Sequence, residues 1–247
     1  GDAQQVSLIR TLDPQGPYKR LWQPFIAEWQ PQHLLVVYGG ELRGKVDMGD
    51  MLCCISTDDG AGWSEPVTVF DHRQWHGSQR FAYANPVLFR PSGQAIVWCF
   101  AMRCPLYYRD SEDSQLCAAY TIDGGWSWQP VELAVHHHSS LITCAEIIEY
   151  PVDGGIRYLL GTHRNSLRHD PLGRQDQFVL ESDNLLEWRL AGYVLAPETP
   201  AVFLHEGNIA EGDRPGELKI VMRTATAGRE NYTSLDEPTA YSSVSQD

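Results

Sequence analysis

The sequence lacks any apolar stretch close to the roughly 18 to 20 residues that a membrane-spanning helix requires. It also lacks a basic run, because 19 Lys and Arg residues stand against 32 Asp and Glu residues and the net charge is −13. Nucleic acid is therefore not expected as a partner, since no cluster of cations could neutralise its phosphates. An anionic small substrate stays compatible with this charge, because a few local arginines suffice to bind it.

Metal-binding cysteine patterns are absent too. The six cysteines form neither a C-x-x-C pair nor a Cys/His cluster, and the adjacent Cys53 and Cys54 would point to opposite faces of a strand. We therefore expect buried free thiols, no metal and no cofactor. A disulfide between Cys99 and Cys104, or between Cys104 and Cys117, is the alternative that the spacing leaves open.

A signal peptide is not recognisable in the first residues, Gly-Asp-Ala-Gln-Gln. We expect a soluble protein, and a mature secreted or periplasmic form is compatible with the sequence. The sequence does not determine the compartment or the oligomeric state.

A motif of the form S-x-D-x-G-x-x-W repeats along the chain. It spans Ser56–Trp63 and, with Thr in the first place, Thr121–Trp128. A degraded copy, Glu181–Trp188, keeps the Asp at position 183 and the Trp. In the motif the Asp can accept hydrogen bonds from turn amides, the Gly of the first two copies supplies a positive φ, and the Trp packs the turn onto its sheet. We interpret these Asp residues as structural.

Short apolar runs recur in phase with this motif. They start 61, 62 and 61 residues apart, at Leu34–Tyr38, Ala95–Phe100, Arg157–Leu160 and Leu218–Met222. A turn and another short run precede each of them, at Phe25–Glu28, Val87–Phe89, Glu146–Ile148 and Asn208–Ala210. Each unit thus consists of strand, turn, strand, longer loop, strand, motif turn and strand. The sequence predicts an all-β protein, a β-propeller built from four-stranded antiparallel blades.

The repeated motif resembles the Asp box of the sialidase (neuraminidase) superfamily, also called BNR-repeat proteins, over nearly the whole chain. The resemblance implies a six-bladed propeller, of which residues 1–247 would supply about four blades as one domain that is incomplete at its C-terminus. It also implies an exo-acting glycoside hydrolase for an acidic or related sugar of a glycan. A polysaccharide lyase and a non-catalytic carbohydrate-binding propeller are the alternatives that the same fold allows.

Strand connectivity indicates where a site should lie. The start of the first strand and the loop between the second and third strands meet at the end of a blade opposite to the motif turn. Glu206 and Arg223 occupy this end and resemble the family segment in which an Arg binds the substrate carboxylate. The family's Glu polarises a Tyr nucleophile, which would lie beyond residue 247. A salt bridge at the blade end is the alternative interpretation of this pair.

The loop before the first motif turn contains Asp47 and Asp50. In the family the general acid/base Asp comes from this loop, and we expect Asp47 to take that role, which favours a raised pKa. We expect Asp50 to tie the loop to the third strand, at the edge of the substrate site. Arg43 resembles a family Arg close to the substrate.

Two features depart from the family pattern. Trp22 stands where the first strand of the family carries an Arg, and Arg20 could replace that Arg only if the strand shifts by two residues. His163 and Arg164 support the lyase alternative, in which a base removes a proton beside a uronate carboxylate and a cation stabilises the enolate. In the binding-module alternative, Trp22, Trp75 and Tyr83 would stack on sugar faces.

Overall fold

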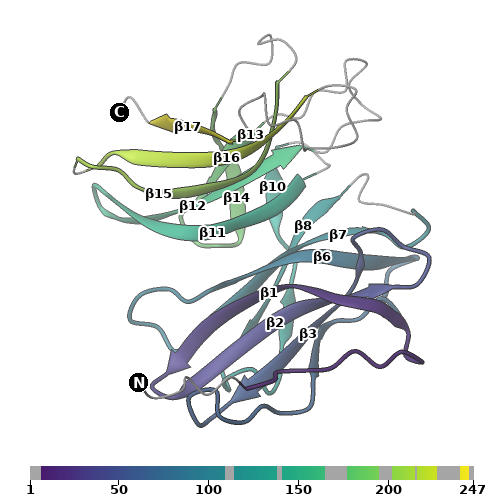
Figure 1. The fold of residues 1–247 in the computed structure, drawn as a ribbon. Helices are drawn as coiled ribbons and strands as arrows, with labels where there is room; N and C mark the ends of the chain where they lie inside the picture. Colours follow the sequence, from purple (N-terminus) through teal and green to yellow (C-terminus); the bar gives the residue numbers. More distant parts are fainter. Residues whose placement is uncertain are drawn as a thin grey trace. The chain divides into compact units, whose positions relative to one another are not determined.

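The computed structural model describes residues 7–108, 114–137, 141–164, 177–194, 202–214, 216–226 and 240–244. The regular secondary structure within these ranges consists entirely of β-strands, which confirms the all-β prediction (Figure 1). No described segment forms a helix with the length and apolar character needed to cross a bilayer.

The chain divides into two compact units, residues 1–110 with 118–131 and residues 111–117 with 132–247, and each is described by itself. The prediction of a single domain over residues 1–247 stays a prediction.

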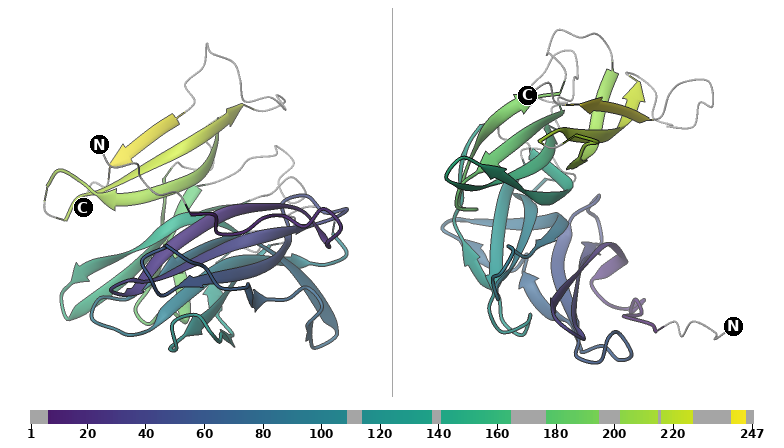
Figure 2. Two further views of the ribbon diagram at one scale, coloured as in Figure 1. Left: turned by 60° about the horizontal axis from the view of Figure 1, so that its bottom comes forward. Right: turned by 90° about the vertical axis from the view of Figure 1, so that its left-hand side faces the viewer.

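A nine-stranded sheet contains the first two blades. Its strands are β1 (Tyr18–Gln30), β2 (His33–Leu42), β3 (Gly49–Ser56), β4 (Val67–Phe70), β5 (Trp75–His76), β6 (Gln79–Phe89), β7 (Val97–Pro105), β8 (Gln115–Thr121) and β9 (Gln129–Val131). Strands β1 to β4 form blade 1 and strands β6 to β9 form blade 2. The two blades join through a bridge between Gly49 of β3 and Tyr83 of β6. The strands of each sheet twist past one another, as Figure 2 shows.

Two further sheets follow. Blade 3 contains β11 (Leu141–Val152), β12 (Gly155–Arg164), β13 (Gln177–Ser182) and β14 (Glu187–Tyr193), and β10 (Ala134–His136) pairs parallel to β14. The described part of blade 4 contains β15 (Val202–Glu211), β16 (Leu218–Thr226) and β17 (Ala240–Val244). The predicted apolar runs fall in the first and second strands of all four blades, which confirms the repeat.

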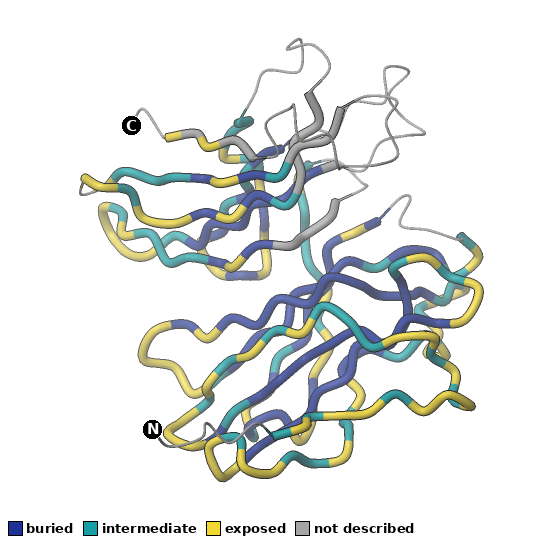
Figure 3. Tube along the Cα trace, viewed as in Figure 1, coloured by how far each residue is buried: buried dark blue, intermediate teal, exposed yellow. Residues whose placement is uncertain are grey.

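Buried side chains fill the faces of these sheets (Figure 3). One core cluster in blade 1 contains Val36, Tyr38, Leu52 and Cys54. In the second unit, Leu159, Ile209, Ile220 and Met222 form another. Five cysteines are buried free thiols, as predicted, and the sixth, Cys144, lies outside the described side chains: Cys53, Cys54, Cys99, Cys104 and Cys117.

The first two motif turns have the predicted hydrogen bonds. In the first turn, the Oδ1 of Asp58 accepts from the Ser56 hydroxyl and from the amide of Gly62, each at 2.8 Å. In the second, Thr121 and Asp123 make the same contacts, and the Gly125 amide donates to the Thr121 hydroxyl at 2.9 Å. Asp58 and Asp123 therefore satisfy turn amides, which is a structural task.

The third turn corrects the predicted alignment. Asn184, not Asp183, accepts the amides of Leu186 and Glu187 at 2.9 Å each, and Ser182 accepts the amide of Leu185 at 2.8 Å. This turn is one residue shorter, since it contains one left-handed residue, Leu185 at φ 67°, where the first turn contains two. Asp183 instead forms ion pairs with two arginines, Arg157 and Arg189.

Candidate functional site

The first strand of every blade contains an irregularity at about the same place. The pairing register shifts between Trp22 and Phe25, Ala84 and Val87, Thr143 and Ile147, and His205 and Asn208. In three blades a polar residue within the bulge adopts a left-handed conformation: Gln23 at φ 48°, Asn85 at φ 55° and Glu206 at φ 52°. Such conformations cost about 1–3 kcal/mol outside glycine and cluster at functional sites, and bulges re-aim side chains.

Glu206 is the charged member of this series, and it forms a two-point ion pair with Arg223. Arg223 Nε donates to Glu206 Oε2 at 2.6 Å and Nη2 donates to Oε1 at 3.0 Å. The two side chains are 40% and 38% exposed, so solvent reaches both. The structure therefore brings the two residues together as the salt bridge that the sequence analysis gave as the alternative, with Glu206 on the bulge of β15 and Arg223 on β16. Their part in a substrate site stays a prediction.

Two buried side chains hold the backbone of this bulge. The ring of His163, a residue only 3% exposed, accepts a hydrogen bond on its Nδ1 from the amide of Glu206 at 3.2 Å. Gln177 accepts the amide of Gly207 at 3.0 Å, while its own amide group donates to Thr162 O at 2.7 Å. Sequence reasoning missed Gln177, whose available signal was a polar residue at the start of an apolar strand.

His163 does not have the surroundings of a solvent-facing base. Its Nδ1 is occupied by the Glu206 amide and its ring is buried, so its observed role is to position the bulge. Arg164 pairs through its backbone with Leu141 of β11, and its side chain lies outside the described part of the structure. These observations do not favour the lyase alternative.

Gly161 allows the bulge to approach β12 closely. A Cβ at this position would collide with the carbonyl oxygen of Gly207. The glycine is therefore required by the packing of the Glu206–Gly207 backbone, not by its own φ.

A second cluster of charges lies in the first unit, at the end of blade 1 opposite the motif turn. Arg20 forms ion pairs with Glu41 and Asp47, and Lys19 approaches Glu41 at 3.0 Å. The Asp47 amide also donates to Glu41 at 2.7 Å. The Glu41 side chain is completely buried, whereas that of Asp47 is 49% exposed. The importance of Glu41 was not recognised from the sequence.

The pKa values of these two carboxyl groups move in opposite directions. Burial raises the pKa of Asp47 above its usual value, although the Arg20 charge opposes the change. Burial would also raise the pKa of Glu41, but hydrogen bonds from Lys19, the Asp47 amide and Arg20 outweigh it and lower that pKa. Of the two, Asp47 therefore has the surroundings that suit a proton donor.

Arg20 lies over the ring of Trp22, with its Cζ 4.6 Å from the ring centroid. Trp22 pairs with Gly39, where a Cβ would collide with the indole. Trp22 thus packs against its own blade, and the cation that reaches Asp47 comes from two residues earlier in the chain. Arg20 is the residue that, in the sequence analysis, could replace the family's first-strand Arg only if the strand shifted by two residues.

Asp50 is 4% exposed and anchors the loops at this blade end. It accepts hydrogen bonds from the Tyr18 hydroxyl at 2.7 Å and from the His72 amide at 2.6 Å. Asp50, Asp71 and His72 place possible metal ligands within 4.8 Å of one another. Arg73 already pairs with Asp71 at 2.7 Å, however, so a cation would have to displace these partners.

Arg43 contributes to the same blade end in another way. Its guanidinium donates to the carbonyl oxygens of Pro14 at 2.6 Å and Gly16 at 3.2 Å. It therefore fastens residues before β1 to the β2–β3 loop, a structural contact that the sequence analysis did not predict.

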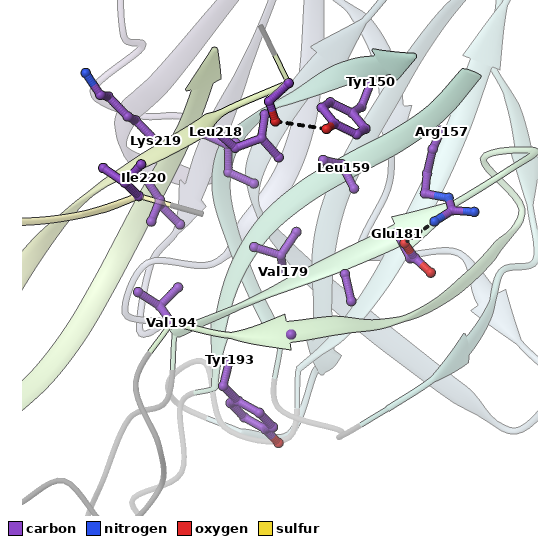
Figure 4. A pocket seen from close by; sticks show the side chains of 15 residues that line it. Tyr150, Arg157, Leu159, Val179, Glu181, Tyr193, Val194, Leu218, Lys219 and Ile220 are labelled. Atoms are coloured by element: carbon purple, nitrogen blue, oxygen red, sulfur yellow. Dashed lines mark hydrogen bonds and ion pairs between the residues drawn. The ribbon is translucent and has the colours of Figure 1, made fainter. Parts of the chain in front are cut away.

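The second unit also contains a cavity of about 540 Å³. As Figure 4 shows, its walls are largely apolar side chains of β12, β13 and β16, such as Leu159, Val179 and Ile220. Arg157 pairs with Glu181 at its edge at 3.1 Å. Among the described residues that line the cavity none is a predicted site residue, and several belong to the core cluster. We therefore assign this cavity no part in the predicted site.

No protein-family model matches the sequence, and no curated protein matches it. The fold, in contrast, is similar to solved structures. An α-L-arabinofuranosidase from Fusarium graminearum with an iminosugar inhibitor has a TM-score of 0.65 at 16% identity, over 99% of this chain and 68% of that one. An α-L-arabinanase from Penicillium chrysogenum with arabinobiose has a TM-score of 0.60 at 14% identity, over 92% and 63%.

A Trypanosoma rangeli sialidase in complex with the inhibitor DANA has a TM-score of 0.55 at 13% identity, covering 83% of this chain and 35% of that chain. This chain spans 65% and 66% of the length of the first two structures in the comparison, slightly less than two thirds. At these identities the likeness shows the fold: the chain is built from the blades of a β-propeller.

Proposed function

We propose that the protein is an exo-acting glycoside hydrolase that removes an acidic or related sugar from the end of a glycan. The observation that carries the proposal is the Glu206–Arg223 pair, in which a carboxylate on a left-handed bulge is held by two charge-assisted hydrogen bonds. The left-handed conformation of Glu206 costs about 1–3 kcal/mol. A surface salt bridge contributes only about 0–1 kcal/mol to stability, so the salt bridge alone does not offset this cost.

Glycoside hydrolysis commonly uses two carboxyl groups with different protonation states. Glu206, held by two hydrogen bonds from Arg223, is placed to act as a base or as the activator of a nucleophile. The raised pKa of Asp47 suits the acid that protonates the leaving oxygen. Within the second unit we assign Glu206 the role of base or activator, with Arg223 as its cationic partner. Within the first unit Asp47, with Arg20 as its partner, is the candidate for the acid, and each assignment is tested separately.

The activities for which the structural neighbours are named define the first assays. An arabinofuranosidase, an arabinanase and a sialidase share the fold, so the panel contains chromogenic α-L-arabinofuranosides, sialosides and uronides. Because low identity shows the fold alone, the sugar has to be found by measurement.

The test compares Glu206→Gln with Glu211→Gln. Both substitutions replace a carboxylate on β15, but Glu211 is the last residue of that strand and lies outside the bulge between His205 and Asn208. On the substrate that the protein cleaves, we expect Glu206→Gln to lower kcat by about 10²–10⁴-fold and Glu211→Gln to leave it unchanged. Wild-type turnover by Glu206→Gln, or no turnover of any glycoside in the panel by the protein, would refute the proposal.

A further inference from the structure

Two exposed aromatic side chains flank a groove in blade 2. Trp75 of β5 is 62% exposed, and Tyr107, which follows β7, is 73% exposed. The groove has a volume of about 570 Å³, within the range of roughly 300–1,000 Å³ that is typical of small-molecule sites. Exposed apolar patches that are rimmed by polar residues mark binding sites, and Tyr and Trp are enriched at binding surfaces.

The charge of the groove is positive. Arg80 lies over the Trp75 ring at 5.0 Å, and the other described lining residues are uncharged: Trp75, Ser78, Gln79, Leu106 and Tyr107. Across the described ranges, no carboxylate pairs with the Arg80 guanidinium. A cation of this kind stands out in a chain of net charge −13.

Backbone hydrogen bonds fix both walls of the groove. Trp75 and Arg80 pair across the β5–β6 hairpin, and the Leu106 amide donates to Arg80 O at 2.9 Å. The Lys45 ammonium donates to Leu106 O and to Tyr108 O. A ligand would therefore meet an ordered surface, so that little conformational entropy is lost on binding.

Lys45 connects the groove with the carboxylate cluster of the first unit. It belongs to the loop between β2 and β3 that also carries Asp47, two residues further on. The groove thus lies at the end of the first unit that contains this cluster, away from the motif turns.

We propose that this groove is a binding subsite for a carboxylate-bearing sugar unit of the glycan. The apolar face of a sugar ring stacks on an aromatic ring, and the planar guanidinium of Arg80 binds a carboxylate through two parallel hydrogen bonds. The inference takes the class of ligand, a glycan, from the proposed function. It adds that one sugar unit of this glycan carries a carboxylate and that this unit binds in the groove.

The experiment measures binding of an oligogalacturonide, and of a neutral oligosaccharide of the same length, by titration calorimetry. We expect the acidic ligand to bind more tightly, and Trp75→Ala or Tyr107→Ala to weaken its binding by about tenfold. Arg80→Gln should remove the preference for the acidic ligand. Trp126→Ala is the matched control, because Trp126 is also exposed, at 53%, but lies in the second motif turn.

The same titration is repeated with Glu206→Gln, which separates this proposal from the hydrolase. Tight binding that depends on Trp75 supports the subsite even if no glycoside is cleaved. Equal binding by Trp75→Ala and the wild-type protein overturns the subsite even if hydrolysis is found. Equal affinity for the acidic and neutral ligands overturns the assignment of a carboxylate.

Discussion

The amide of Glu206 donates a hydrogen bond to Nδ1 of His163 at 3.2 Å, so a buried ring on β12 fixes a half-exposed carboxylate on β15. His163→Leu removes the acceptor and should lower kcat more than it changes KM, because Glu206 is then held less accurately. His163→Asn, whose Oδ1 can take the place of Nδ1, should restore much of the rate. Equal kinetics for the two variants would show that the contact does not position Glu206.

Gly161 should tolerate no side chain. Gly161→Ala forces a Cβ against Gly207 O and should destabilise the protein by about 1–3 kcal/mol while lowering kcat. Gly192→Ala is the control, since a Cβ there meets no atom within 4 Å. Urea denaturation and steady-state kinetics of both variants test this, and an unchanged Gly161→Ala protein would contradict the observed packing.

The alkaline limb of the pH–rate profile should belong to Asp47. A general acid works in its protonated form, so kcat/KM falls as the pH rises through its pKa. Arg20 lowers the pKa of Asp47 against the effect of burial, and Arg20→Gln should therefore move this limb to higher pH. Lys19→Gln, which removes a weaker influence, should move it less. A limb that moves to lower pH would exclude Asp47 as the acid.

Glu41 should contribute to stability in a pH-dependent way. Its folded-state pKa is lowered, because hydrogen bonds from Lys19, the Asp47 amide and Arg20 outweigh burial. Its contribution is therefore present at neutral pH and disappears as the pH falls through that lowered value. Glu41→Gln should reduce the free energy of unfolding by about 1.5–3 kcal/mol at neutral pH. Chemical denaturation in acid should show a smaller difference from the wild-type protein.

The third motif turn should depend on Asn184. Asn184→Ala leaves the amides of Leu186 and Glu187 without their acceptor and should cost about 1–2 kcal/mol. Asp183→Ala removes only solvent-exposed ion pairs and should destabilise the protein less than Asn184→Ala does. Thermal unfolding of the two variants decides between the observed alignment and the one that the motif predicts.

Periodic features were readable from the sequence because they depend on local chemistry. Alternation of strands and turns with a period near 61 residues placed the first and second strands of all four blades, and Ser56 with Asp58 indicated the turn hydrogen bonds. The third turn escaped this reasoning because deleting one residue shifts the accepting side chain from Asp183 to Asn184. The motif was recognised by its Asp and Trp positions alone, so it did not reveal that the third turn lacks one residue.

The sequence by itself determined the blade repeat, the turn chemistry and the end of each blade where ionisable groups gather. The Glu206–Arg223 pair was expected, but only the tertiary structure showed that the Glu206 amide meets His163, that Gln177 holds the Gly207 amide, and that Asp47 meets Arg20 and Glu41. Strand patterns report which face a residue occupies, whereas these contacts depend on bulges and on residues far apart in the chain. A bulge displaces a side chain without changing the hydrophobic pattern of the strand's sequence.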